Sequence, residues 1–357
     1  MFRFAVERVP AEPGCPMAIS PLSPLSLHFL GDDGYSLVTQ PHIGFAVVLQ
    51  TTINRSVHAI GIGVHGASKV RMTLRPAPEN TGIVFVRADR GDAAIEAKAH
   101  WVCDTLLSTS VGEGDLRVAT VEHLMSALWG VGVDNLIVEL NGEELPILDG
   151  SAAPFVRLVQ SVGLRKQSAL RRFIRVRREI EVRHGDSFAL LRPFDGFRAS
   201  YTFVADHPVY NRFPKSACID FGSVAYEDAV AGARSFGLMA ELAAAQAANR
   251  CLGSSLENAV GIDEQGVLNP EGLRCDDEFV KHKVLDALGD LYLLGGPLLG
   301  EFVGYKSGHT LNNRLARALL EAPSAWEYVT FGSDPQRLAP RSQGAHQTPS
   351  RARPVAR

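Results

Sequence analysis

One stretch of the chain, residues 277–294, limits the possible folds more than any other. It reads DEFVKHKVLDALGDLYLL. At 100° per residue, four polar side chains and Phe279 share one stripe about 100° wide; the four are His282, Lys283, Asp286 and Asp290. Most of the remaining circumference is apolar, so we expect a helix packed against other elements over much of its surface. A histidine and two aspartates at i, i+4 and i+8 of such a helix need a specific explanation.

The composition is that of an ordinary globular protein. The 357 residues are 46% hydrophobic and 21% charged, with a formal net charge of -3. This length suggests two domains, and the weak acidity without a basic, aromatic-containing tract predicts no nucleic-acid partner. The five cysteines form no CxxC pair, which argues against a disulfide framework or a thiolate zinc site and favours a reducing cytoplasm. No run approaches the ~18 apolar residues of a membrane helix, so we expect no transmembrane segment.

The two ends of the chain differ from its middle. Prolines interrupt residues 1–46, where we expect a poorly ordered N-terminal extension and no secretion signal. Residues 333–357 are rich in Pro, Ser, Gln and Arg, which predicts a disordered, locally basic tail. Between them we expect a first α+β domain at 47–168 and a second at 173–332. The basic run at 164–179 is interpreted as a linker that enters a new strand.

The order of elements repeats between the two halves. In the first half, alternation and turn residues predict three strands, a helix, a strand and a second helix, at 56–64, 70–76, 82–88, 120–132, 135–140 and 149–163. Thr120 and Ser151 are the expected N-terminal caps of the helices, and Gly130 and Gly132 the expected stop of the first. From about residue 173, strands again precede helices, which are expected between about 223 and 248. This predicts two α+β domains of similar design.

The polar stripe offers two ligands for a metal ion. His282 and Asp286, at i and i+4, lie about 5 to 6 Å apart at Cβ, which suits two ligands of one divalent ion. His123, near a helix start in TVEHL, is a third candidate, and Glu122 beside it offers a general base. Two histidines and one aspartate with an open position are typical of a catalytic zinc site. His309 follows a glycine between a strand and a helix, and we expect it on an exposed loop.

These residues alone leave other interpretations open. HxxxD also occurs on solvated helix faces and where a core histidine bonds an aspartate, and acids are common near helix starts because of the helix dipole. The spacing is also compatible with a zinc amidohydrolase, such as a peptidase without HExxH, and with a non-catalytic binding protein that has a structural metal. Intact Glu122 and His309 favour an enzyme over a binding protein.

Five longer motifs resemble one enzyme family. They are GIGVHGASKVRMTLRPAPENTGIVF, ATVEHLMSALWGVGVDNLIVELNGEELPILDGSAAPFV, ARSFGL, VLNPEGLRCDDEFVKHKVLDALGDLYLLG and YKSGHTLNNRL. In this order, over about residues 50–331, the chain is similar to the zinc-dependent UDP-3-O-acyl-N-acetylglucosamine deacetylase of lipid A biosynthesis. The resemblance implies two similar α+β domains, each a β-sheet with helices on one face. The helices of both would be packed between the two sheets, with the catalytic site at the domain junction.

The resemblance also implies roles for the polar residues of the stripe and its neighbours. Glu122 matches the general base, His309 the general acid, and Asp290 the carboxylate that orients and charges that histidine. The implied ligands of Zn²⁺ are His123, His282 and Asp286.

Three further residues match positions that contact the substrate. Lys283 matches a substrate-contacting lysine, and Phe236 an aromatic beside the sugar and the acyl chain. Ser235 stands where the family commonly has threonine. Its hydroxyl would help to bind the carbonyl oxygen, with more rotamer freedom than a β-branched side chain has.

The reaction implied by the resemblance is hydrolysis of the N-acetyl group of UDP-3-O-(3-hydroxyacyl)-N-acetylglucosamine. Its products are acetate and UDP-3-O-acyl-glucosamine, and it is the committed step of lipid A biosynthesis. The expected partner is therefore an acylated UDP-sugar. The alternatives to this deacetylase are another zinc amidohydrolase and a non-catalytic UDP-sugar or lipid-precursor binding protein with a structural metal. We expect a cytoplasmic monomer that makes transient contact with a membrane surface.

Overall fold

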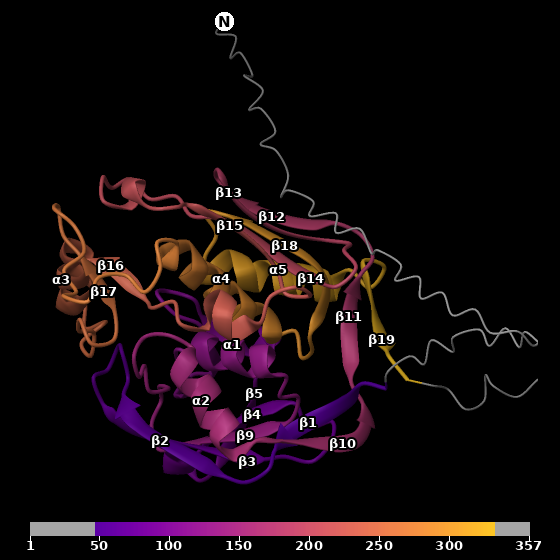
Figure 1. Cartoon of the computed structure of the whole chain (residues 1–357). Helices are drawn as coiled ribbons and strands as arrows, with labels where there is room; N and C mark the ends of the chain where they lie inside the picture. The colour runs from indigo at the N-terminus through magenta and orange to yellow at the C-terminus, as the bar shows by residue number, and fades with distance from the viewer. Residues whose placement is uncertain (1–46, 333–357) are drawn as a thin grey trace, which may run out of the picture.

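The computed structural model describes residues 47–332. The expectations for 1–46 and 333–357 lie outside the described residues. Figure 1 shows one sheet at the bottom, one at the top and the main helices between them. This is the predicted α+β arrangement, with two sheets that enclose helices from both halves of the chain.

The first half builds a five-stranded sheet covered by two helices. The sheet runs in the order β2 (Val57–Ile62), β3 (Lys69–Pro76), β9 (Leu136–Leu140), β4 (Ile83–Arg87), β5 (Ala93–Glu96). Alternate residues of β3 are buried, as expected for a sheet with one face on the core. The helices are α1 (Glu122–Val131) and α2 (Ala153–Val162), and a small sheet contains β6 (Val102–Asp104), β7 (Ser110–Glu113) and β8 (Leu116–Val118).

The second half builds a seven-stranded sheet around a long strand, β18 (Leu298–Tyr305). β18 pairs antiparallel with β13 on one side and parallel with β14 and β11 on the other. The other strands are β11 (Arg172–Val176), β12 (Ile180–His184), β13 (Ser187–Arg192), β14 (Phe197–Thr202), β15 (Ser216–Asp220) and β19 (Trp326–Thr330).

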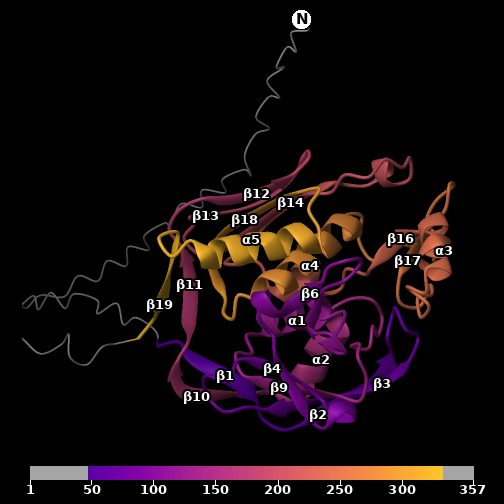
Figure 2. The same ribbon diagram turned by 180° about the vertical axis from the view of Figure 1, so that it is seen from behind.

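Two helices of the second half cover the inner face of this sheet. α4 (Glu278–Tyr292) contacts β14 and β15, and α5 (His309–Glu321) contacts β12 and β13. Figure 2 shows from behind how α5 lies under β12 and β13. α4 also packs along α1, so the helices of the two halves share one hydrophobic core. A separate unit of β16 (Phe236–Leu238), α3 (Met239–Ala247) and β17 (Val260–Ile262) lies at the edge.

The basic run expected as a linker is a pair of strands instead. β10 (Leu164–Leu170) pairs antiparallel with β1 (Leu49–Ile53), and β11 follows almost directly. Residues 164–170 are thus not irregular, which the sequence could not indicate because the strand partner of β10 lies more than 100 residues away. The predicted entry of the run into a new strand is confirmed by β11. The domain boundaries 47–168 and 173–332 stay a prediction.

The expected cap at Thr120 was also wrong. Thr120 has a φ of 59°, and its hydroxyl donates to Glu144 at 3.0 Å, while Val121 occupies the cap position without a side-chain bond. Gly132, with a φ of 81°, ends α1 as predicted. Ser151 lies one residue before the cap of α2, and its Oγ accepts the N–H of Ala153 at 3.3 Å.

The region from 223 to 248 is less helical than expected. It contains a short π-helical turn, η4 (Glu227–Ala231), the strand β16 and only then α3. β16 pairs in parallel with β17, which follows it by more than 20 residues. Within residues 47–332, none of the helices has the length and apolarity needed to cross a bilayer.

Candidate active site

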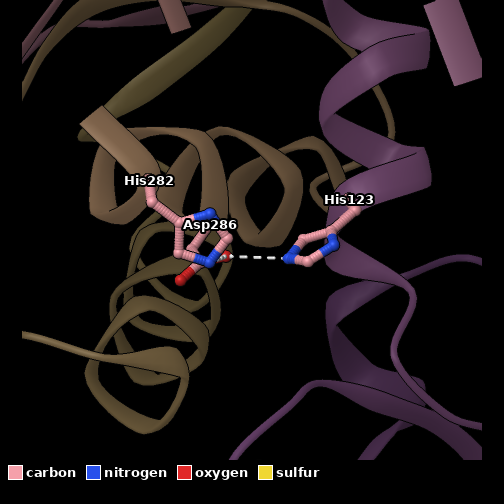
Figure 3. A group of neighbouring side chains, drawn as sticks. All are labelled: His123, His282 and Asp286. Atoms are coloured by element: carbon pink, nitrogen blue, oxygen red, sulfur yellow. Dashed lines mark ion pairs between the residues drawn. The ribbon is translucent and has the colours of Figure 1, made fainter. Parts of the chain in front are cut away.

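Helices α1 and α4 bring three ligand groups to one point. His123 comes from the first turn of α1, and His282 and Asp286 from one face of α4, as Figure 3 shows. Asp286 Oδ1 lies 3.5 Å from His123 Nε2 and 3.4 Å from His282 Nε2. All three ligand atoms lie within 4.8 Å of one another, and all three residues are buried. The solvated-face interpretation of the stripe is therefore excluded.

The orientation of these groups fits a bound cation. His282 Nδ1 lies 3.1 Å from the carbonyl oxygen of Ala233, which directs Nε2 into the cluster. Asp286 Oδ1 is buried and has no hydrogen-bond partner among the described residues. A buried carboxylate oxygen without a donor costs free energy, which a cation between the three groups would recover. Burial, together with His123 and Lys283, lowers the pKa of His282 to about 3 despite Asp286, so this imidazole is in the neutral form that binds metals.

A glycine allows the two helices to approach each other at this point. A Cβ on Gly289 of α4 would lie 1.9 Å from the backbone oxygen of Glu122, which no Cβ could tolerate. Glu122 is the first residue of α1, so the absence of a side chain at Gly289 brings the start of α1 against α4. This contact sets the distance between His123 and the two ligands on α4.

A carboxylate and an imidazole, those of Glu122 and His309, lie beside the three-residue cluster. Glu122 is buried, and its Oε2 accepts the backbone N–H of Thr109 at 3.0 Å. Its other oxygen lies 4.0 Å from His309 Nε2. Burial raises the pKa of Glu122, against the opposing charges of His309 and His123. His309 begins α5 and its side chain is 11% exposed, so the expectation of an exposed loop was wrong.

Asp290 holds the other side of His309. Its Oδ2 accepts from His309 Nδ1 and from Asn312 Nδ2, both at 2.9 Å, and its Oδ1 accepts from Thr109 Oγ1 at 2.6 Å. Burial alone would lower the pKa of His309, but the charge and hydrogen bond of Asp290, with Glu122, raise it to about 9. His309 is therefore charged at neutral pH. Its Nε2 is the atom that can give up a proton on the side of Glu122.

Eight of the nine residues singled out in the sequence line one cavity of about 190 Å³. They are Glu122, His123, Ser235, Phe236, His282, Lys283, Asp286 and His309. The ninth, Asp290, lies behind His309. Lys283 Nζ is 2.9 Å from Asp286 Oδ2 and 5.5 Å from the centre of the Phe236 ring. Burial alone would lower the pKa of Lys283, but Asp286 and Tyr201 raise it to about 12.

A second cavity of about 420 Å³ adjoins the first and is lined mainly by apolar groups. Both cavities share Val64, Leu107, Ser235 and Phe236 as wall residues. The walls of the second come largely from β16, α3 and β17, the unit at the edge of the fold. The polar cluster therefore opens onto an apolar space.

The chain also matches a known protein family. The family model for LpxC, UDP-3-O-acyl N-acetylglycosamine deacetylase, covers residues 50–321. The chain belongs to this family. LpxC membership confirms the resemblance inferred from the five motifs, and it implies a deacetylase of lipid A biosynthesis in a metalloenzyme family. The two-domain α+β fold agrees with that family.

Sequence reasoning missed three residues that organise the site. Thr109 and Asn312 each bond Asp290, and Gly289 allows the contact between α1 and α4. Nothing in the sequence around Thr109 indicates its partner, which is 181 residues away. A signal existed for Gly289, because a lone glycine inside a helical pattern costs about 1 kcal/mol against alanine and usually has a packing reason.

Proposed function

We propose that this LpxC-family chain hydrolyses the N-acetyl group of UDP-3-O-(3-hydroxyacyl)-N-acetylglucosamine, with Zn²⁺ as its metal. Water adds across the amide, so the products are acetate and UDP-3-O-acyl-glucosamine. The observation that carries the proposal is the meeting of Glu122 and His309, 4.0 Å apart, beside the three-ligand cluster. The family match supports the substrate class.

The donor set supports zinc as the metal. Two imidazole nitrogens and one carboxylate oxygen are the ligand types of catalytic zinc sites, which keep a position open. His123, His282 and Asp286 would hold the ion. When bound, zinc supplies Lewis acidity, which acidifies a coordinated water and polarises a carbonyl.

The proton transfers fall to residues of the chain. Glu122 accepts a proton from the attacking water, and its raised pKa keeps it a base of useful strength. His309, charged and held by Asp290, donates a proton to the leaving nitrogen, because an amine without that proton is a poor leaving group. The hydroxyl of Ser235 donates to the carbonyl oxygen as negative charge develops on it.

The walls of the two cavities support the assignment of the remaining substrate contacts. Phe236 belongs to both cavities, and we assign it to the sugar and the start of the acyl chain. The acyl chain then extends into the apolar cavity. Lys283, with about a quarter of its side chain exposed, contacts polar groups of the substrate.

The setting of the reaction is proposed on separate grounds. Four cysteines are free among the described residues, which supports the reducing cytoplasm: Cys103, Cys218, Cys251 and Cys275. The exposed side chains of Leu106 and Leu107, the latter in the wall of both cavities, support transient contact with a membrane surface. The monomeric state stays a prediction, which sedimentation of the purified chain would test.

One experiment tests the proposed reaction. The purified chain is incubated with a UDP-3-O-acyl-N-acetylglucosamine, with and without a chelator, and acetate is measured. We expect acetate release, loss of activity with chelator, recovery with added zinc and about one zinc per chain. Acetate release by a metal-free preparation would exclude the zinc role. Binding of the substrate without acetate release would favour a non-catalytic binding protein, and cleavage of peptides alone would favour a peptidase.

A further inference from the structure

Thr109 uses all of its polar groups on the residues around the cavity. Its backbone N–H donates to Glu122 Oε2 at 3.0 Å, and its backbone oxygen accepts the N–H of Val121, which precedes α1, at 3.1 Å. Its hydroxyl donates to Asp290 Oδ1 at 2.6 Å. Thr109 is only 1% exposed. Through its backbone and its side chain, Thr109 therefore joins the start of α1 in the first half to α4 in the second half.

We propose that Thr109 is the positioning residue that aligns the acid of the site with its base. This inference rests on the proposed function, because it assigns Thr109 to the Glu122 and His309 pair. The backbone of Thr109 fixes the carboxylate of Glu122, and its hydroxyl fixes the carboxylate that holds His309.

The physical reason lies in the freedom of an aspartate side chain. The terminal torsion of aspartate is broad and roughly two-fold, so packing defines the carboxylate plane less sharply than it defines an aliphatic rotamer. Hydrogen-bond donors must define it instead. Asp290 Oδ2 receives two donors from the first turn of α5, His309 and Asn312, but Oδ1 receives the hydroxyl of Thr109. Without that hydroxyl, a buried carboxylate oxygen would lack a donor and the carboxylate would turn to find one.

The hydrogen bond between Thr109 and Asp290 connects the two halves of the chain. Thr109 lies just before β7 in the first half, and Asp290 is 181 residues further on, in α4. The same residue contacts Glu122 through its backbone, which a change of side chain leaves in place. Replacement of the side chain therefore tests the acid side separately from the base side.

The test compares Thr109→Val, which removes the hydroxyl but keeps the β-branched shape, with Thr109→Ser, which keeps the hydroxyl. Loss of a supporting hydrogen bond behind a working group typically costs about 10- to 100-fold in activity. We expect that loss in kcat for Thr109→Val, with KM changed less than about twofold. Thr109→Ser should recover most of it. Thr105→Val is the control, because Thr105 lies on the same segment and its hydroxyl bonds Thr310 at an exposed position.

A double-mutant cycle separates positioning from a general structural effect. In an Asp290→Ala background, the further change Thr109→Val should alter kcat less than about twofold, since the side chain that the Thr109 hydroxyl bonds is gone. Full, independent losses from both changes would overturn the proposal. So would a Thr109→Val enzyme with kcat like wild type while Asp290→Ala is impaired.

A spectroscopic readout keeps the test independent of turnover. The Nδ1 proton of His309, held by Asp290, should give a downfield proton NMR signal in wild type and in Thr109→Ser, assigned by its absence in His309→Ala. In Thr109→Val the signal should shift or broaden; an unchanged signal would overturn the proposal. If Thr109→Val does not fold, Thr109→Ala replaces it in both measurements. Failure of wild type to release acetate would reject the proposed function alone, because the NMR comparison decides the role of Thr109 by itself.

Discussion

The cavity has two sides that are built in opposite ways. On one side, Asp286 Oδ1 faces two histidine nitrogens and lacks a hydrogen-bond donor among the described residues. On the other side, both oxygens of Asp290 have donors, three in all. The first side is incomplete without a further group, whereas the second is complete within the protein. This difference suits a metal-ligand side and a proton-transfer side.

The pKa values of the two histidines, His282 on the metal-ligand side and His309 on the proton-transfer side, are shifted in opposite directions. Burial lowers the pKa of His282 to about 3, while for His309 the nearby carboxylates outweigh burial and raise the pKa to about 9. Each imidazole has a carboxylate neighbour, but His282 also lies close to His123 and Lys283, whose charges oppose its protonation. The same residue type is thus neutral on one side and charged on the other. The predictions below test this division.

The largest effects should separate the two sides by metal content. His282→Ala should lower the zinc content and abolish activity, because one of three ligands is lost. Glu122→Ala and His309→Ala should retain zinc, yet lose about 10²- to 10⁴-fold in kcat, the usual contribution of a general base or acid. Metal analysis and steady-state kinetics on the same preparations check both. Loss of zinc from Glu122→Ala would contradict the division, since Glu122 would then be a ligand.

Ser235 extends the comparison to a third wall of the cavity. If its hydroxyl stabilises the developing oxyanion, Ser235→Ala should lower kcat by about 10²- to 10³-fold. Ser235→Thr should be neutral or mildly favourable, because a β-branch restricts the rotation that serine has. Alanine is smaller than serine and threonine is larger, so the pair of variants separates the effect of the hydroxyl from that of side-chain size. Wild-type kcat in Ser235→Ala would remove Ser235 from the reaction.

Asp290→Asn should move the pH dependence in a defined direction. His309 must be protonated to act as the acid, so wild-type activity should fall as pH rises through about 9. Removal of the Asp290 charge lowers the pKa of His309, and the alkaline limb of kcat should move to lower pH, with zinc affinity nearly intact. Profiles of kcat against pH for both enzymes check this. An unmoved alkaline limb would show that Asp290 does not support His309.

The same shift predicts a change in stability with pH. The folded-state pKa of His309 lies above its ordinary value of 6.5. Its protonation therefore stabilises the fold fully below about pH 6.5 and ceases to do so as pH rises through about 9. The free energy of unfolding of Asp290→Asn should therefore fall less than that of the wild type between about pH 6.5 and about pH 9. Unfolding at several pH values in urea measures it, and equal losses in both proteins would contradict the account.

Gly289→Ala should impair the metal-ligand side and the proton-transfer side together. We expect a smaller effect from it than from the changes above. A methyl group against the backbone of Glu122 forces α1 and α4 apart, and such overpacking typically costs about 1 to 3 kcal/mol. Zinc affinity and kcat should both decrease, because His123 and Glu122 move as one. Gly232→Ala is the matched control, with no atom within 4 Å of the added carbon and no left-handed φ. A change in only one of the two properties would show that the sides are held independently.

Much of the fold was predictable because local periodicity carries it. The alternation in β3 and the 3.6-residue pattern of α4 are visible without knowledge of any partner. The spacing of His282 and Asp286 also predicted their convergence, since residues at i and i+4 of a helix share a face. The strand β16 and its pairing with β17 could not be found in this way. Both strands are only three residues long, and their pairing is parallel and non-local.

The sequence by itself determined many of the elements, among them the helix that carries the polar stripe, and the family to which the chain belongs. Only the tertiary structure decided which hydroxyl completes Asp290, that His309 is nearly enclosed and that residues 164–170 form a strand. The physical reason is the separation in the sequence between the residues that contact each other. A helix or strand pattern is set by neighbours a few residues apart, whereas Thr109 and Asp290, or Leu49 and Leu170, meet only after distant parts of the chain have packed together. Contacts of that kind determine the charge and orientation of the groups at the site.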